Sequence, residues 1–194
     1  MRRLLAVEFV TVDGVMQGLG SPDEDRDGGF EYGGWGTAYA DVLDEVLDPG
    51  TLGSAAGYLL GRRTYDALAA FWPAQPPDNP MAASLNRAAK YVVTRTRTSL
   101  DWSGAEVVSG DLPAEIGRLK SAGDGTLTML GSGMLLQEVI RLGLLDDLQL
   151  FVHPLLLGAG KRLFGELVEP RRLELTKAGT TSKGTVALSY RLGA

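Results

Sequence analysis

The segment Met129–Gly133 (MLGSG) combines glycine and hydroxyl groups directly after an apolar run, and an amphipathic stretch follows it. Gly131, Ser132 and Gly133 are therefore predicted to form a tight turn that opens a helix at Met134. In such a turn the backbone N–H groups and the positive end of the helix face one point, which favours a phosphate ligand. These residues alone leave open the alternative of a tight turn without a ligand.

A second segment, Gly61–Tyr65 (GRRTY), repeats this pattern of a strand that passes through a glycine into a helix. Arg62, Arg63 and Thr64 would lie in the first helical turn. Cations at a helix N-terminus oppose the helix dipole at a cost of about 0.3 to 1 kcal/mol each, so a bound anion would explain them. The alternative is that both arginines are solvated surface residues.

A third segment, Thr94-Arg95-Thr96-Arg97, follows a predicted strand. It again offers hydroxyl and guanidinium groups at the carboxyl end of a strand, where open α/β sheets bind their ligands. Two glycine turns and this segment together suit a diphosphate that carries a further phosphate.

The elements that must position these segments alternate along the chain. Strands are predicted from apolar, β-branched runs and helices from apolar residues at helical spacing. The predicted strands are 3–12, 55–61, 90–94, 105–108, 126–130, 148–153, 173–179 and 185–192. The predicted helices are 37–47, with Thr37 as N-cap and Pro49-Gly50 as its end, 63–72, 112–122, with Asp111 as cap, and 134–144. This order predicts one domain over residues 1–194, a three-layer α/β/α fold with a mostly parallel sheet and an antiparallel C-terminal hairpin.

Two stretches rich in glycine or proline are predicted to be loops. Residues 17–36 are interpreted as a long surface loop of the kind that often forms a lid, and residues 76–80 as a second loop. The acidic run at residues 23–27 matches the first half of a calcium-binding loop, but Gly34 stands where a bidentate glutamate is required. No metal site is predicted.

The composition excludes several classes of protein. The 194 residues include no cysteine and one histidine, so disulfides, thiolate metal sites and Ser-His-Asp triads are not expected. We interpret the histidine, His153, as a packed, hydrogen-bonded residue at the end of a strand. A net charge of −5 without a basic run argues against nucleic acid as a partner. No apolar run approaches the ~20 residues of a membrane span, so no membrane association is expected. The lack of cysteine fits a reducing compartment, and we expect a cytoplasmic protein.

The order of these segments, from the first strand and its Asp13-Gly14 turn through GRRTY, KYVVTRT and TLTMLGSG to LQLFVHPLLLGAG, resembles the dihydrofolate reductase superfamily. Within it, the chain is similar to the C-terminal reductase domain of the riboflavin-biosynthesis deaminase-reductase and to its stand-alone relatives. The resemblance implies an NADPH-dependent reductase that transfers a hydride to a C=N or C=O bond of a small pteridine-, pyrimidine- or sugar-like substrate. It also implies a homodimer.

The resemblance assigns cofactor-binding roles to residues from four segments. They are Met16 and Gln17 at the nicotinamide, Gly61, Arg62, Arg63 and Thr64 near the adenosine-side phosphates, Thr94 and Arg95 near the 2′-phosphate, and Gly131, Ser132, Gly133 and Met134 at the pyrophosphate.

The catalytic prediction is Asp41. In the family a carboxylate a few residues after a tryptophan helps to protonate the pterin, and Asp41 follows Trp35 at nearly that spacing. A general acid would need a pKa raised by burial. The alternatives are a solvated carboxylate at Asp41, proton delivery by Asp44, Glu45 or water, and a non-catalytic NADP(H)-binding or ligand-sensing module on the same fold.

Overall fold

The computed structural model describes residues 1–47, 54–165 and 169–193. The strands are β1 (Arg3–Thr11), β2 (Gly57–Gly61), β3 (Lys90–Val93), β4 (Ala105–Val108), β5 (Thr126–Leu130), β6 (Asp147–His153), β7 (Leu173–Thr180) and β8 (Val186–Leu192). Their hydrogen-bonded order is β4-β3-β2-β5-β1-β6-β8-β7. The predicted fold class is confirmed: the sheet is mostly parallel, helices accompany it, and an antiparallel hairpin closes the chain.

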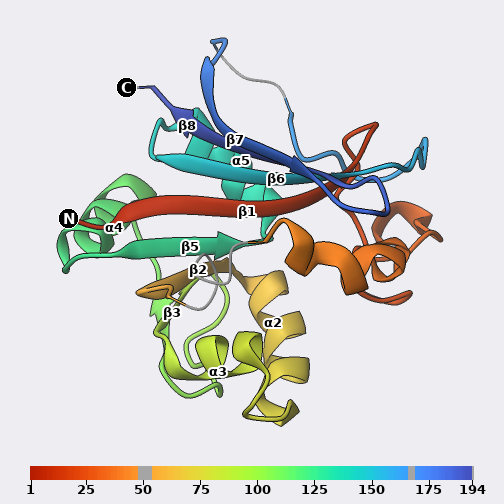
Figure 1. Ribbon diagram of the computed structural model, residues 1–194. Coiled ribbons are helices and arrows are strands. Elements are labelled where there is room, and N and C mark those ends of the chain that lie inside the picture. The colour runs from red at the N-terminus through yellow and green to blue at the C-terminus, as the bar shows by residue number, and fades with distance from the viewer. Residues whose placement is uncertain (48–53, 166–168, 194) are drawn as a thin grey trace. The chain divides into compact units, whose positions relative to one another are not determined.

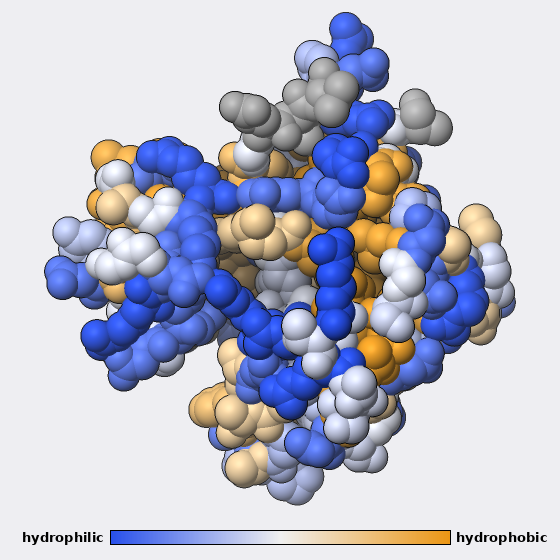
Figure 2. Space-filling model, turned by 180° about the vertical axis from the view of Figure 1, so that it is seen from behind, coloured by the Kyte–Doolittle hydropathy of each residue, from blue (hydrophilic) through white to orange (hydrophobic). Residues whose placement is uncertain are grey.

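The helices are α2 (Arg62–Phe71), α3 (Pro80–Arg87), α4 (Leu112–Ser121) and α5 (Gly133–Arg141), with three 3₁₀ segments, η1 (Asp27–Gly29), η2 (Trp35–Glu45) and η3 (Trp72–Ala74). Within the described ranges, no helix combines the length and the apolar character that a bilayer crossing requires. Figure 2 shows hydrophilic residues over much of the face in view, with hydrophobic residues gathered in smaller areas.

The chain divides into two compact units, each built from separate stretches of sequence. The first unit comprises Met1–Ala6 and Asp48–Asp146, and the second comprises Val7–Leu47 and Asp147–Ala194. Strand β1 therefore contributes residues to both. The single domain expected over residues 1–194 stays a prediction.

In the first unit, parallel strands carry the core. β2 pairs in parallel with both β3 and β5, and β3 pairs with β4. α2 and α3 lie together on one side of β2 and β3 (Figure 1). The Tyr58 hydroxyl of β2 lies 2.7 Å from Ser84 Oγ of α3, which joins helix to sheet inside the core. Lys90 is buried, and its Nζ donates to Leu85 O (2.9 Å) and lies 4.7 Å from the centroid of the Trp102 ring.

In the second unit, the sheet is antiparallel at its C-terminal strands. β8 pairs with both β6 and β7, and the turn between β7 and β8 matches the predicted turn at Ser182-Lys183-Gly184. Phe9 of β1 stacks on Phe151 of β6, with 4.8 Å between ring centroids.

The helix predicted over residues 37–47 is wrong in type and in its cap. Residues Trp35–Glu45 form the 3₁₀ segment η2, which follows Gly34. Thr37 does not cap it, because the Thr37 hydroxyl donates to Gly34 O (2.7 Å) from inside the segment. The predicted end at Pro49-Gly50 lies outside the described residues.

The loop predicted at residues 76–80 ends in the first residue of α3, a helix that the sequence analysis does not predict. Asn79 is its N-cap, and Asn79 Oδ1 accepts from Met81 N (3.0 Å) and Ala82 N (3.1 Å). Pro80 occupies the first helical turn, where its missing N–H removes no intrahelical bond. The Asn79-Pro80 pair is a helix-start signal. The sequence analysis missed it because Pro76, Pro77 and Pro80 together are typical of a loop.

The other predicted boundaries agree with the structure within a few residues. Asp111 caps α4 as predicted, with Oδ2 accepting from Ala114 N (3.0 Å). α5 ends at Arg141 instead of Leu144, because Gly143 adopts a positive φ of 68° and ends the helix.

Strand β1 buries a carboxyl group in the second unit. Glu8 is 3% exposed, and among the described residues its Oε1 has no hydrogen-bond partner. Burial raises the pKa of Glu8 to about 8, because the charged form loses its hydration. Glu8 is therefore mostly protonated at neutral pH.

We expect Glu8→Gln to flatten the pH dependence of stability. The Glu8 carboxyl has a pKa of about 8 when folded and near 4.5 when unfolded, so its favourable contribution is complete below pH 4.5 and is lost as pH rises through about 8. Each unit of pKa difference corresponds to about 1.4 kcal/mol at full effect, so the wild-type free energy of unfolding should fall by a few kcal/mol across this window.

Urea unfolding of wild type and Glu8→Gln at about pH 5 and about pH 8 measures this difference. The exposed Glu31→Gln variant is the control and should keep the wild-type slope. A Glu8→Gln protein with the same pH slope as wild type would show that Glu8 does not titrate in this way.

Candidate functional site

The two glycine turns singled out in the sequence lie against each other in the first unit. The turn after β2 begins at Gly61, and the turn after β5 contains Ser132, whose Oγ accepts a hydrogen bond from Gly61 N at 2.8 Å. Gly131 has a φ of 65°, and a Cβ there would lie 3.6 Å from Thr64 Cγ2, so the first turn of α2 packs on the β5–α5 turn. Segments about 70 residues apart thus form one structure.

Ser132 holds this junction in a conformation that favours glycine. Its φ of 70° and ψ of 41° are left-handed, and among the described residues it is the one non-glycine residue with a positive φ. This conformation costs about 1 to 2 kcal/mol. The hydrogen bond from Gly61 offsets part of that cost, and Ser132 O accepts from Leu135 N (2.8 Å) and Leu136 N (3.0 Å).

The helices that open from these turns differ from their neighbours at the N-terminus. Asn79 and Asp111 cap α3 and α4 with their side chains. In the described part of the chain, no side chain caps α2 or α5, and neither has an acidic residue in its first turn. The first N–H groups of a helix lack intrahelical acceptors, so two adjacent uncapped N-termini form an anion-binding arrangement. Gly133 and the exposed Met134 begin α5 there.

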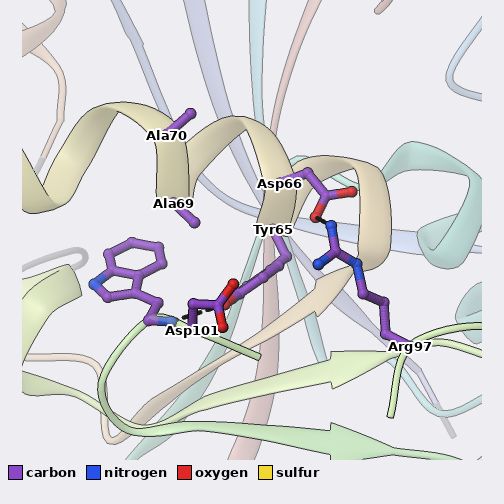
Figure 3. Close-up of a pocket in the computed structure, with 7 residues that line it drawn as sticks. Tyr65, Asp66, Ala69, Ala70, Arg97 and Asp101 are labelled. Atoms are coloured by element: carbon purple, nitrogen blue, oxygen red, sulfur yellow. Dashed lines mark hydrogen bonds and ion pairs between the residues drawn. The ribbon is translucent and has the colours of Figure 1, made fainter. Parts of the chain in front are cut away.

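Arginines near this junction share one carboxylate. Arg62 Nη1 lies 3.0 Å from Asp66 Oδ2, and Arg97 Nη2 lies 2.6 Å from Asp66 Oδ1. Figure 3 shows the Arg97–Asp66 pair at a cavity of about 340 Å³, which is also lined by Tyr65, Ala69, Ala70, Asp101 and Trp102. Two guanidinium groups on one carboxylate leave a net positive charge beside the N-terminus of α2. Arg97 belongs to the Thr94–Arg97 segment that the sequence analysis indicates, whereas the sequence patterns do not indicate Asp66 as a site residue.

In the Thr94-Arg95 segment, Thr94 shapes the turn after β3 and Arg95 places a positive charge near α5. Thr94 is buried, and its Oγ1 accepts from Thr96 N (3.2 Å) and Arg97 N (3.2 Å), which shapes the turn after β3. Arg95 is exposed. Its charge contributes to lowering the pKa of Glu138 on α5, although the hydrogen bond from Arg141 is the main cause. Arg95 is therefore near α5, the helix that begins at the Ser132 turn.

Gln17, predicted to contact the nicotinamide, forms hydrogen bonds within the second unit. Its Nε2 donates to Asp25 O (3.1 Å) and Asp27 O (3.0 Å), and its Oε1 accepts from Lys161 N (2.9 Å). Lys161 Nζ in turn pairs with the Asp25 and Asp27 carboxylates at 2.6 and 2.8 Å. These aspartates of the calcium-like run therefore bind a lysine. The cofactor role of Met16 and Gln17 stays a prediction.

Asp41 lacks the environment that a general acid requires. Its side chain is 65% exposed, and both carboxylate oxygens accept from Lys183 Nζ at 2.6 and 2.9 Å. The hydrogen bond from Lys183 lowers the pKa of Asp41, so it is ionised at neutral pH. Glu45, one of its predicted alternatives, accepts from Ser182 N and Oγ at 2.7 Å each, which lowers its pKa as well.

The glycine-rich loop after β6 is fastened to the turn after β1. Asp13 accepts from Leu157 N (3.3 Å) and Gly158 N (2.8 Å). The hydrogen bond from the Thr11 hydroxyl, followed by that from Gly158, lowers the pKa of Asp13 to about 2. The Asp-Gly turn that marks the end of the first strand is thus also an anchor for a distant loop.

Comparison with known proteins decides the family. A family model described as the RibD C-terminal domain matches residues 3–187. The chain belongs to the RibD C-terminal domain family. This confirms the resemblance inferred from the order of the sequence segments.

One curated protein and two solved structures are similar to this RibD C-terminal domain protein. The uncharacterized protein YyaP of Bacillus subtilis (strain 168) is 26% identical over 196 residues, which cover 97% of this chain and 94% of YyaP. A putative riboflavin biosynthesis protein from Shewanella sp. PV-4 is 20% identical, with a TM-score of 0.72 and 99% of each chain covered. Dihydrofolate reductase from Enterococcus faecalis, solved with NADP(H) and RAB-propyl, is 14% identical, with a TM-score of 0.57 and coverage of 99% and 97%. The two solved structures show that the fold is shared.

The Ser132 hydroxyl should contribute measurably to the stability of this RibD C-terminal domain protein. Ser132→Ala removes the acceptor for Gly61 N and keeps the left-handed strain, so we expect a loss of about 1 kcal/mol in the free energy of unfolding. Ser132→Gly removes the same hydrogen bond but also relieves about 1 kcal/mol of strain, so it should lie closer to wild type. Urea unfolding of the three proteins gives the values, and an Ala variant as stable as wild type would contradict this role.

Proposed function

We propose that this protein is an NADPH-dependent reductase that transfers a hydride to a C=N or C=O bond of a small pteridine-, pyrimidine- or sugar-like substrate. The observation that carries the proposal is the pair of uncapped helix N-termini joined by the hydrogen bond between Gly61 N and Ser132 Oγ. Membership of the RibD C-terminal domain family supports it, as does the fold shared with a dihydrofolate reductase solved with NADP(H). In keeping with the family resemblance, we further propose a cytoplasmic homodimer.

The residues of the first unit fit the phosphate groups of a dinucleotide. The N–H groups that begin α2 and α5 are proposed to bind the pyrophosphate, because two helix N-termini with no acidic residue in the first turn favour a doubly charged anion. Ser132 keeps these two turns together, and the small residues around it allow the backbone to approach a phosphate closely. Arg95 and Arg62 are the proposed partners of the 2′-phosphate, since a guanidinium group binds phosphate with two parallel hydrogen bonds.

When bound, NADPH would supply the hydride, and the protein would position the acceptor and provide a route for a proton. Asp41 fits the role of proton donor poorly in this geometry, because its ion pair with Lys183 lowers its pKa. We therefore propose that water delivers the proton unless Asp41 is released from Lys183.

The ion-paired Asp41 also favours a second candidate, a non-catalytic NADP(H)-binding or ligand-sensing module. Both candidates share the nucleotide site and differ only in whether the protein turns over a substrate. A shared fold does not establish turnover.

Thermal unfolding with NADPH, with NADH and without ligand tests the shared claim. A ligand at about 100 times its dissociation constant should stabilise the protein by about 2.7 kcal/mol. We expect stabilisation by NADPH, and no shift with either cofactor would reject both candidates. Loss of nicotinamide absorbance with pterins, pyrimidines or carbonyl compounds then supports the reductase, whereas binding without turnover supports the module.

Arg95→Ala should narrow the preference for NADPH over NADH by about 10- to 100-fold, which corresponds to the loss of one charged hydrogen bond of about 1.5 to 3 kcal/mol. The affinity for NADH should change little, because NADH lacks the 2′-phosphate. Calorimetric titration of both cofactors measures the ratio. Arg118→Ala is the matched control, because Arg118 lies on α4 and pairs with Glu106 and Glu115. If the ratio of NADPH to NADH affinity is the same in Arg95→Ala as in the control, Arg95 does not bind the 2′-phosphate.

A further inference from the structure

The one histidine of the chain presents an unpartnered polar atom in the interior of the second unit. His153 ends β6, is 1% exposed, and has its Nδ1 3.0 Å from Thr185 Oγ1. Its Nε2 is buried, and the described residues provide no hydrogen-bond partner for it. Leaving a buried polar group unpaired usually costs about 1 to 3 kcal/mol, so such an atom calls for an explanation.

Aromatic rings surround this imidazole. Phe9 of β1 stacks on it at 6.1 Å between centroids, Trp35 meets it edge-on at 5.5 Å, and Tyr39 lies tilted over it at 4.7 Å. Phe9 belongs to the sheet, whereas Trp35 and Tyr39 both belong to η2. The segment η2 therefore covers His153.

The covering segment has features of low local stability. An 11-residue run of 3₁₀ helix is long for that geometry, whose hydrogen bonds are poorer than those of an α-helix. Of its residues, only Trp35 and Gly36 are buried. Trp35 is anchored through its Nε1, which donates to Gln17 O at 2.7 Å. Tyr39, further along η2, has the tilted contact with His153 and is only partly buried.

The outer side of η2 is attached to the β7–β8 turn through exposed polar contacts. Lys183 Nζ binds the Asp41 carboxylate and also donates to Ala38 O at 2.9 Å. Ser182 donates to Glu45 through both its N–H and its hydroxyl. Exposed ion pairs of this kind are weak because water competes for both partners. The attachment can hold η2 in place and can also release it.

We propose that His153 Nε2 is a hydrogen-bonding group for the planar substrate, and that η2 is a movable cover whose Tyr39 leaves the imidazole when the substrate binds. The proposal deepens the proposed reductase function and rests on it. A planar heterocycle would take the place of the Tyr39 ring against the imidazole, and one of its ring N–H or C=O groups would satisfy Nε2. In this role His153 positions the substrate.

The surroundings of His153 suit such recognition. Burial lowers the pKa of His153 to about 4, so the imidazole is neutral at pH 7 and bonds a neutral heterocycle without burying a charge. The charged groups on the covering segment and its attachment, Asp41, Asp44, Glu45 and Lys183, are all exposed. Asp41 is paired with Lys183, and Glu45 accepts from Ser182 of the turn.

Diethyl pyrocarbonate tests the cover directly, because it acylates neutral imidazole and the chain contains one histidine. Modification of His153 is followed by peptide mass spectrometry without any cofactor. Lys183→Met breaks the attachment and should speed modification by up to about fivefold, since an exposed ion pair is worth up to about 1 kcal/mol. Tyr39→Ala, which removes the covering ring, should speed it at least as much.

Lys177→Met is the control, because Lys177 is an exposed residue of β7 outside the attachment. It should modify at the wild-type rate. Equal rates in wild type, Lys183→Met, Tyr39→Ala and the control would overturn the cover, whatever the outcome of the NADPH experiments.

The substrate-binding role is tested with dihydrofolate and uracil as probes, in the presence of NADPH. We expect at least one probe to slow modification of His153 and to shift the ¹⁵N resonance of Nε2, and His153→Gln to raise the KM of a consumed probe more than it lowers kcat. Absence of protection and of a resonance shift with both probes would overturn the role of Nε2 in binding this class of substrate. NADPH binding to the unmodified protein would still be intact in that case, so the two proposals fail separately.

Discussion

The hydrogen bond from Gly61 N to Ser132 Oγ is the contact on which the candidate nucleotide site depends. It joins the ends of β2 and β5 at the point where each strand passes into a helix, and it does so from a serine in a strained left-handed conformation. Because the Ser132 side chain bonds across to Gly61, it does not cap its own helix, and the N-terminus of α5 stays available to an anion. The Ser132 side chain thus joins the two strand ends and also leaves the N-terminus of α5 uncapped.

The charges around this junction follow the same principle. Asp66 forms ion pairs with both Arg62 and Arg97. Its single negative charge neutralises only one of them, so a net positive charge remains beside the N-terminus of α2. The helices α3 and α4 of this unit use Asn79 and Asp111 as caps, which are among the preferred N-cap residues. In the second unit, burial raises the pKa of Glu8 to about 8 and lowers that of His153 to about 4, so both buried groups are mostly neutral at pH 7.

Most of the fold can be predicted from the sequence because each strand, turn and helix is formed by residues close together in the chain. A buried strand, a glycine turn and an amphipathic helix lie within about 15 residues of one another, so the residue pattern alone assigns GRRTY and MLGSG to strand ends. α3 escapes this reasoning because Pro76, Pro77 and Pro80 are typical of loops, although Asn79 and Pro80 are favourable at a helix start. The predicted length of α5 is too great because the apolar pattern continues past Gly143, where the backbone leaves the helix.

The side-chain environments cannot be predicted in this way, because they depend on distant partners. The spacing from Trp35 selects Asp41, but the pKa of Asp41 is set by Lys183, 142 residues away. The family resemblance assigns Gln17 to the nicotinamide, but it does not indicate that Gln17 Oε1 accepts from Lys161 N, 144 residues away. The interpretation of His153 as packed and hydrogen-bonded is confirmed, whereas its unpartnered Nε2 follows only from the three-dimensional packing around it.

The central claim, that two uncapped helix N-termini bind the phosphates of NADPH, is tested most directly by the backbone amide resonances of ¹⁵N-labelled protein during titration with NADPH. The account predicts the largest shifts at Arg63, Thr64, Gly133 and Met134, the residues that begin α2 and α5. Binding of NADPH that leaves these amides unshifted, or absence of binding at millimolar concentration, would contradict it.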